Sequence, residues 1–485
     1  MQTLGRIFWL FVLSLAWLFA IEKSEERDRG KDQNPDHHRY YAYFPNTVLP
    51  WTLGCLVLLP GIPILRDLGM GKQILAMCFI VFLHMSVYYV LLAMAMPLIR
   101  RYCNARVCAT LWLLPNYLYL ICNKLIAPNV PKWTVYVPDN ILLILVLVWA
   151  VGFLAVLGWK VLVHFRFRRY ILEDAAEVTD PAILAIWQDE LNRAGYAAQK
   201  PYMLVCSPAV ATPLTVGFRK KSIRVVLPQR SYTPEELRLI FRHEIVHIGR
   251  DDSGTKFFFA FCTAMCWFNP LMWWAMRRSA DDLELSCDET VLLEADAGQR
   301  RQYADLLLRT AGDERGFTTC LSASARALRY RLHWVVNPVK RFTGSFLAGA
   351  ILFGLMFTCG HVTLAFDQTT GADLIFAGES PALYELDDNE VYWLNRYVGV
   401  KEPEALKDYL AGLEICDVSG LYELEEGPQE IRIFLEKDGE SIRVTLSDHV
   451  MGFRGHGSRY ESYYVEDEID WDYLEGLLWL EPPRG

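Results

Sequence analysis

Three residues of the stretch HEIVH, namely His243, Glu244 and His247, have the types and spacing that metal chemistry requires. On a helix, residues i and i+4 share one face, so both imidazoles can reach one metal ion while Glu244 points at a metal-bound water. That is the arrangement of a zinc peptidase. A five-residue pattern of this kind also occurs by chance on helix surfaces. A metal site therefore needs a further ligand from elsewhere in the chain.

The acidic stretch 281–288 (DDLELSCD) offers candidates for that ligand. Catalytic zinc usually takes three protein ligands and leaves a fourth position for water. Glu284 and Asp288 are four residues apart and share a helical face, so one can bind the metal while the other orients a ligand through a hydrogen bond. The alternative interpretation is an acidic, solvated helix start.

The motifs, in this order and spacing, resemble the BlaR/MecR family of membrane-embedded zinc peptidases over roughly residues 115–365. The resemblance is carried by HEIVH, by Arg250-Asp251-Asp252, by Phe268-Asn269-Pro270, by the run from Glu284 to Leu292 and by the upstream segments 212–217 and 223–228. It implies that His243, His247 and Glu284 are the ligands of one zinc ion. It further implies that Glu244 is the general base and that Asp288 orients a ligand through a hydrogen bond without binding the zinc ion itself.

The reaction expected of this ligand set is peptide-bond hydrolysis. Zinc polarises the substrate carbonyl and lowers the pKa of its bound water towards about 7, while Glu244 takes the proton and delivers it to the leaving amine. The segment Thr212, Pro213, Leu214 and Thr215 offers an exposed strand edge to an extended substrate in one interpretation. In the other interpretation, these residues form a loop that has only a structural role.

The composition is that of a membrane protein with soluble parts: 485 residues, 53% hydrophobic, with a mean hydropathy of +0.15. Apolar runs at 7–21, 51–65, 74–98, 107–122, 141–163 and 346–366 are candidate spans. Those at 74–98, 141–163 and 346–366 are long enough for a bilayer core, which needs roughly 20 residues. The run 51–65 is short and interrupted by prolines, and 7–21 is equally a signal anchor.

Arginines at 100, 101 and 106 follow the run 74–98, and those at 166, 168 and 169 follow the run 141–163. By the positive-inside rule both groups are cytoplasmic, and so is the catalytic segment that follows Arg169. The side of the amino terminus stays open. We therefore predict a multi-pass membrane α-helical protein of the bacterial cell membrane. Its parts are a transmembrane region (1–165), a cytoplasmic α+β zincin-like peptidase domain (166–342), a transmembrane helix (343–366) and a small extracytoplasmic α+β domain (367–485).

The apolar segment 257–276 poses a geometric problem, because it is as long as a span yet separates His247 from Glu284. A single crossing would put the two ligands on opposite sides of the membrane. The segment must fold back on itself or lie in the interface, and Asn269-Pro270 is a plausible bend.

Local patterns define several further elements. A helix is expected over 181–194, short strands over 201–206 and 222–227, and a helix that begins after the N-cap Thr233, with Pro234 at its first position, and ends near Gly249. Leu237, Ile240 and Phe241 contribute to its buried stripe. In the tail, strands at 431–435 and 441–446 flank an Asp-Gly turn, 403–413 reads as a helix, and 471–479 as a short helix or a strand.

The tail is acidic and differs from the family's sensor. From Thr363 onward, 9 Lys and Arg oppose 28 Asp and Glu, a net charge of −19 against −9 for the whole chain, which leaves +10 for the rest. No serine after 363 is followed three positions later by lysine, and no KTG occurs, so a penicillin-binding site is not expected. The pattern Ser253 to Lys256 beside the zinc helix is read as coincidence. Acidic clusters at 387–390, 423–426 and 466–470 favour solvated surface over a cation site.

The twelve cysteines do not form a disulfide framework, and Cys287 is interpreted as packing. No phosphate-cradling loop or nucleic-acid-binding module occurs, so direct nucleic acid binding is not expected.

We therefore predict a zinc metalloendopeptidase and signal transducer. By the family resemblance, it cleaves itself, a cytoplasmic winged-helix repressor, or both, after an extracytoplasmic stimulus. Two alternatives stay open: a receptor that has lost turnover and signals by conformational change, and a housekeeping protease of membrane proteins. The lipid bilayer and a protein or peptide substrate are the expected partners.

Overall fold

The computed structural model describes residues 2–28, 68–121, 131–195, 202–217, 222–310, 325–339, 341–386, 391–418, 429–455 and 460–479. Its helices are α1 (Gln2–Asp28), α5 (Leu68–Tyr102), α6 (Ala105–Leu113), η2 (Leu114–Tyr117), α7 (Leu118–Ile121), α8 (Asp139–Glu173), α9 (Pro181–Arg193), α10 (Pro234–Arg250), α11 (Asp252–Met265), α12 (Pro270–Val291), α13 (Ala297–Thr310), α14 (Ala325–Val336), α15 (Ser345–Thr358), α16 (Gly371–Leu374), η4 (Pro381–Leu383), α17 (Pro403–Gly412) and α18 (Trp471–Gly476). Its strands are β1 (Trp133–Tyr136), β2 (Ala176–Glu177), β3 (Met203–Ser207), β4 (Leu214–Val216), β5 (Arg224–Pro228), β6 (Val362–Thr370), β7 (Glu385–Leu386), β8 (Tyr392–Trp393), β9 (Arg396–Tyr397), β10 (Gly399–Val400), β11 (Glu414–Asp417), β12 (Ile431–Lys437), β13 (Glu440–Ser447), β14 (Val450–Arg454), β15 (Glu461–Val465) and β16 (Leu478–Trp479).

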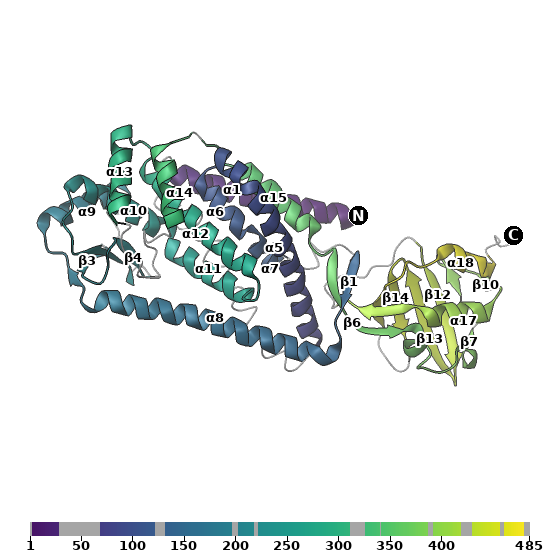
Figure 1. The fold of residues 1–485 in the computed structure, drawn as a ribbon. Helices are drawn as coiled ribbons and strands as arrows, with labels where there is room; N and C mark the ends of the chain where they lie inside the picture. The colour runs from purple at the N-terminus through teal and green to yellow at the C-terminus, as the bar shows by residue number, and fades with distance from the viewer. Residues whose placement is uncertain are drawn as a thin grey trace.

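A helical body occupies the middle of the molecule, with a small sheet at one end and the carboxy-terminal β domain at the other (Figure 1). Two of its helices are long and apolar enough to cross a membrane, Leu75–Tyr102 within α5 and Ile144–Glu173 within α8. Helix α8 leaves apolar side chains such as Val151 and Leu154 65% and 60% exposed. Contact with water disfavours such a surface and contact with lipid does not, so α8 has the character of a lipid-facing helix.

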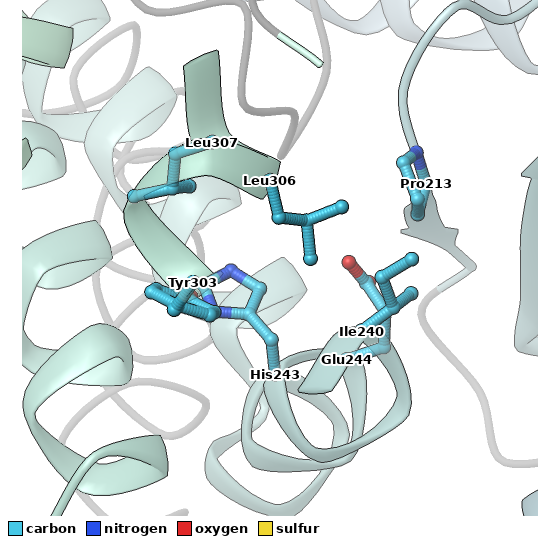
Figure 2. A pocket seen from close by; sticks show the side chains of 7 residues that line it. All are labelled: Pro213, Ile240, His243, Glu244, Tyr303, Leu306 and Leu307. Atoms are coloured by element: carbon cyan, nitrogen blue, oxygen red, sulfur yellow. The ribbon is translucent and has the colours of Figure 1, made fainter. Parts of the chain in front are cut away.

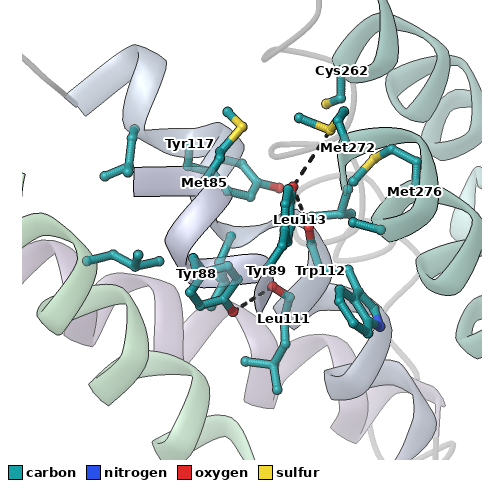
Figure 3. Packing of buried hydrophobic residues seen from close by; sticks show 14 of the residues in the cluster. Met85, Tyr88, Tyr89, Leu111, Trp112, Leu113, Tyr117, Cys262, Met272 and Met276 are labelled. Atoms are coloured by element: carbon teal, nitrogen blue, oxygen red, sulfur yellow. Dashed lines mark hydrogen bonds between the residues drawn. The ribbon is translucent and has the colours of Figure 1, made fainter. Parts of the chain in front are cut away.

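The core of this body lies where α5 packs against α6 and α12 (Figure 3). Its buried polar groups are paired: the Tyr88 hydroxyl donates to the Leu111 carbonyl oxygen at 2.7 Å and the Tyr89 hydroxyl to that of Trp112 at 3.1 Å. Pairing removes the cost of burying a phenol, so aromatic residues can fill this core.

Two of the predicted spans differ from the observed helices. The described part of segment 107–122, residues 107–121, is divided among α6, η2 and α7, with Pro115 at the break, and residues 107–119 are almost wholly buried in the helical body. In segment 346–366 the helix α15 ends at Thr358, Gly360 takes a φ of 86°, and strand β6 begins at Val362. The expected transmembrane helix is therefore shorter than predicted. The run 51–65 and the acidic clusters 387–390 and 423–426 lie outside the described residues.

The opposite end carries a four-stranded sheet in the order β2-β3-β5-β4. Strands β3 and β5 run parallel, and β4 pairs antiparallel to β5 with Leu214 opposite Val226. Helices α9 and α10 pack on this sheet through a core that includes Trp187, Leu204 and Phe241. The predicted helix and strands of this region are confirmed within a few residues. The predicted boundary at 165/166 falls inside α8, which continues to Glu173.

The apolar segment 257–276 folds back on itself. Helix α11 ends at Met265 and α12 begins at Pro270, with the Asn269 side chain accepting a hydrogen bond from the Leu271 amide. The two helices pack against each other and against α10, so the return at Asn269 brings residues 281–288 back to the level of the histidines.

The tail is an α+β domain whose sheet has the order β1-β6-β11-β15-β14-β13-β12-β8-β9. The predicted hairpin is confirmed as β12 and β13, with Asp438 and Gly439 both at positive φ in the turn. The predicted helix is α17, and segment 471–479 contains both the helix α18 and the strand β16.

Several contacts among the described residues join this domain to the helical body, and two of them involve the long apolar helices directly. Strand β1, which directly precedes α8, pairs parallel to β6 with Trp133 opposite Val362. Lys72 near the start of α5 forms an ion pair with Asp367, just beyond the apolar half of β6. The tail is thus tied to the ends of both long apolar helices.

Candidate metal centre

Helix α10 positions the histidine pair. It begins with a capping box in which the Thr233 hydroxyl accepts from the Glu236 amide and the Glu236 carboxylate accepts from the Thr233 amide. His243 and His247, one turn apart, are each only 3% exposed, and their ring centroids lie 4.6 Å apart. The Nε2 atoms of the two rings are 3.0 Å apart, so both point at one position.

Helix α12 brings Glu284 to the same position. Its Oε2 atom lies 3.7 Å from Nε2 of His243 and 3.6 Å from Nε2 of His247. This oxygen is buried and has no hydrogen-bond partner among the described residues. Three ligand atoms that surround one point, one of them a buried carboxylate oxygen without a donor, fit a divalent metal ion.

The outer nitrogen of each histidine is held by a hydrogen bond. His247 Nδ1 lies 2.6 Å from Asp252 Oδ2, and His243 Nδ1 lies 3.0 Å from the Tyr303 hydroxyl. Tyr303 in turn donates to Asp288 Oδ1 at 2.6 Å. These bonds assign Nε2 as the unprotonated, metal-facing nitrogen of both rings.

The carboxylates of Asp288 and Glu284 are each paired with a cationic side chain. Arg331 of α14 donates to both oxygens of Asp288 at 2.6 Å, and Lys256 of α11 donates to Glu284 Oε1 at 2.8 Å. Burial acts to raise the pKa of Glu284, but the Lys256 ammonium opposes it, and the pKa lies well below its ordinary value. Glu284 is therefore a carboxylate with one oxygen bonded and the other directed at the histidines.

Glu244 lies beside the centre and is not a ligand. Its Oε2 atom accepts a hydrogen bond from the Thr215 hydroxyl of β4 at 2.7 Å. It faces a small pocket (Figure 2) whose lining residues are mostly apolar: Pro213, Ile240, His243, Glu244, Tyr303, Leu306 and Leu307. A carboxylate at the edge of an apolar pocket next to a metal centre has the position of a general base.

The predicted substrate segment flanks this pocket. Thr212 and Pro213 precede β4, Leu214 and Thr215 belong to it, and β4 is the outermost strand of its sheet in the part of the chain that the structure describes. Pro213 lines the pocket and Thr215 contacts Glu244. Pro213 and Thr215 therefore lie beside the candidate centre, whereas Leu214 packs in a core cluster with Val205 and Val226. All four residues are buried, so the expected exposed segment is not observed.

Cys287 is part of the surroundings of His247. Its Sγ atom lies 3.4 Å from Asp252 Oδ2 and 3.5 Å from His247 Nδ1. Burial raises the pKa of this thiol, which stays protonated and donates to Asp252. The grouping of His247, Asp252 and Cys287 is thus explained by hydrogen bonds that orient the histidine.

Sequence reasoning missed four contributors to this centre: Asp252, Lys256, Tyr303 and Arg331. Asp252 had a signal, because it belongs to the Arg-Asp-Asp run that follows HEIVH. Lys256 belongs to a Ser-x-x-Lys pattern, but this pattern does not predict a contact with the metal centre. Tyr303 and Arg331 lie on helices α13 and α14, far from the motif in sequence, and no local pattern marks them.

A histidine pair on one buried helix, with a glutamate beside it and a third candidate ligand on a second helix, has the arrangement of a metallopeptidase-type centre. Residues 121–335 match the family described as BlaR1 peptidase M56. A stretch of 125 residues, 26% of this chain, is 26% identical to "Regulatory protein BlaR1" of Bacillus licheniformis and spans 21% of that protein. The family resemblance predicted from the motifs is confirmed over residues 121–335, which are similar to the BlaR1-type M56 peptidases. This likeness and the two long apolar helices indicate a membrane protein.

Proposed function

We propose that this protein is a membrane-embedded zinc metalloendopeptidase in which His243, His247 and Glu284 hold the zinc ion. The observation that carries the proposal is the triangle of 3.0, 3.6 and 3.7 Å between the three ligand atoms. Tetrahedral zinc with ligands at about 2.0–2.1 Å separates them by about 3.3 Å, so the triangle suits zinc without rearrangement.

The mechanism rests on the residues around the triangle. Zinc, when bound, supplies a Lewis acid that polarises a carbonyl and activates water. Glu244 removes a proton from the attacking water and delivers it to the leaving nitrogen of the peptide bond. The Thr215 hydroxyl, at 2.7 Å from Glu244 Oε2, holds this carboxylate in position. The pocket beside it limits the access of bulk water.

An extended peptide is the proposed substrate. The outer edge of β4 supplies backbone groups for strand addition, and Thr212 to Thr215 lead the peptide past Glu244. Pro213, Ile240 and Leu306 favour an apolar substrate side chain next to the cleaved bond.

The proposed setting is a signalling membrane. Helices α5 and α8 cross the bilayer, the peptidase end lies in the cytoplasm, and the acidic tail lies outside, as the arginines near the carboxy-terminal ends of both helices suggest. The protein itself, a cytoplasmic winged-helix repressor, or both are the proposed substrates. An extracytoplasmic stimulus other than penicillin acylation is the proposed trigger.

The test uses the full chain in detergent or nanodiscs. Glu244→Gln should keep one zinc per chain and abolish cleavage of the protein itself and of a co-expressed repressor, whereas Glu235→Gln, at the far end of the same helix, should do neither. Zinc is measured by elemental analysis and cleavage by mass spectrometry of the products. Unchanged products from the Glu244 variant, or wild-type protein without stoichiometric zinc, would refute the proposal.

A further inference from the structure

Lys256 is a partly buried cation that neither the motif nor the proposed chemistry uses. It lies on α11, one turn after Asp252, so the two side chains share one face of that helix. From this face Asp252 reaches His247 Nδ1 and Lys256 reaches Glu284 Oε1. One helix face thus contacts two of the three candidate ligands.

The contact divides the two oxygens of Glu284 between different partners. Oε1 accepts from the Lys256 ammonium at 2.8 Å, whereas Oε2 accepts no hydrogen bond among the described residues. Oε2 faces both Nε2 atoms, and Arg331 Nη1 lies 3.6 Å from it, beyond hydrogen-bond distance. The Lys256 and Glu284 side chains are 22% and 12% exposed, so water does not readily replace this bond.

A carboxylate can bind a metal ion through one oxygen or through both, and a second oxygen would occupy the position that water or substrate needs. An ammonium on Oε1 opposes a metal ion at the same oxygen, because it occupies one of the lone pairs of that oxygen and repels a second cation. We infer that Lys256 is a positioning residue that restricts Glu284 to one-oxygen ligation and so keeps a coordination position open for the reaction. This inference rests on the proposed zinc site.

The test compares Lys256→Met, which has similar length but no donor, with Lys256→Arg, which keeps the charge and the donors. Lys407→Met serves as a matched control, because Lys407 is a buried lysine, 4% exposed, bonded to the Tyr384 carbonyl in the tail. All variants are full-length, purified with zinc, and also loaded with Co²⁺, whose visible absorption is stronger in four-coordinate than in five-coordinate sites.

The expected result for Lys256→Met is one zinc per chain, weaker Co²⁺ absorption, and a kcat lower by about 10- to 100-fold with little change in KM. Lys256→Arg should restore most of the absorption and the kcat, and Lys407→Met should match the wild type in both.

Two results would overturn the inference. One is a wild-type Co²⁺ spectrum in Lys256→Met. The other is loss of zinc from this variant, which would show that Lys256 supports metal affinity and not the mode of ligation. Failure of the proposed function is distinct, because wild-type protein would then lack zinc or the Glu244→Gln variant would still cleave.

Discussion

Arg100 and Asp282 join the end of the long apolar helix α5 to the helix that carries Glu284. The Nε and Nη2 atoms of Arg100 lie 3.1 and 2.8 Å from the two carboxylate oxygens of Asp282, which is fully buried. Trp112 and Tyr330 donate to the same carboxylate from α6 and α14. A fully bonded carboxylate two residues before Glu284 therefore connects three helices to the metal centre.

Replacing Arg100 by Ala should destabilise the protein strongly. The substitution leaves a buried carboxylate without its charge partner, which typically costs about 3–5 kcal/mol. Thermal unfolding in detergent measures the effect, and zinc affinity should fall with it because α12 loses its anchor. Arg101→Ala is the matched control, since Arg101 is exposed and should change the midpoint little. Equal midpoints for the two variants would contradict a structural role for the pair.

Asp252 should control zinc affinity through His247. Its 2.6 Å contact with Nδ1 fixes the ring and its tautomer, and loss of such a partner typically weakens metal binding by about 10- to 100-fold. We expect the Asp252→Ala variant to lose its zinc at chelator concentrations correspondingly lower than the wild type requires. Asp251→Asn, one residue earlier, should retain wild-type affinity. An unaltered affinity in Asp252→Ala would show that the histidine is held by packing alone.

The sequence predicted those parts of the fold that depend on neighbouring residues. Thr233 and Pro234 locate the start of α10, and Asp438 and Gly439 locate the β12–β13 turn, because caps and tight turns depend on a few adjacent residues. The histidine spacing likewise predicts a shared helix face. The fold-back at Asn269 followed from geometry, since both ligand-bearing segments must meet at one ion.

The remainder depends on contacts between distant segments. Tyr303 supports His243 from sixty residues away, and Arg331 approaches Asp288 from α14, so no local pattern indicates either. Hydropathy also failed at the end of α15, because the apolar residues from Val362 onward suit a buried strand as well as a helix. Residues 107–119 are apolar because they are buried among helices.

Asp251 should make stability depend on pH between about 4 and 6. Burial raises the pKa of this carboxyl from 3.8 to about 6 in the folded protein. The folded state therefore binds the proton more tightly, so stability is present at low pH and is lost as pH rises from about 4 to about 6, by at most about 3 kcal/mol.

The variant Asp251→Asn removes this titration and suits the left-handed backbone at this position, where φ is 53°. Its unfolding midpoint relative to wild type should rise as pH increases from 4 to 6 and stay constant above 7. The histidines titrate in both proteins, so their contribution drops out of the difference between the two unfolding midpoints. A difference that is flat over this range would contradict the raised pKa.

Gly439 should set the local stability of the tail hairpin. It takes a φ of 81° in the turn after Asp438, and a Cβ built there meets no atom within 4 Å, so a substitution acts through the backbone alone. The left-handed conformation costs a non-glycine residue about 1–2 kcal/mol, hence Gly439→Ala should speed amide exchange in β12 and β13 by about 5- to 30-fold. Asp438→Asn should leave exchange unchanged, because Asn accepts positive φ at least as well as Asp. Hydrogen exchange read by mass spectrometry on the full chain separates the two variants, and equal protection in both would mean that strand pairing alone fixes the turn.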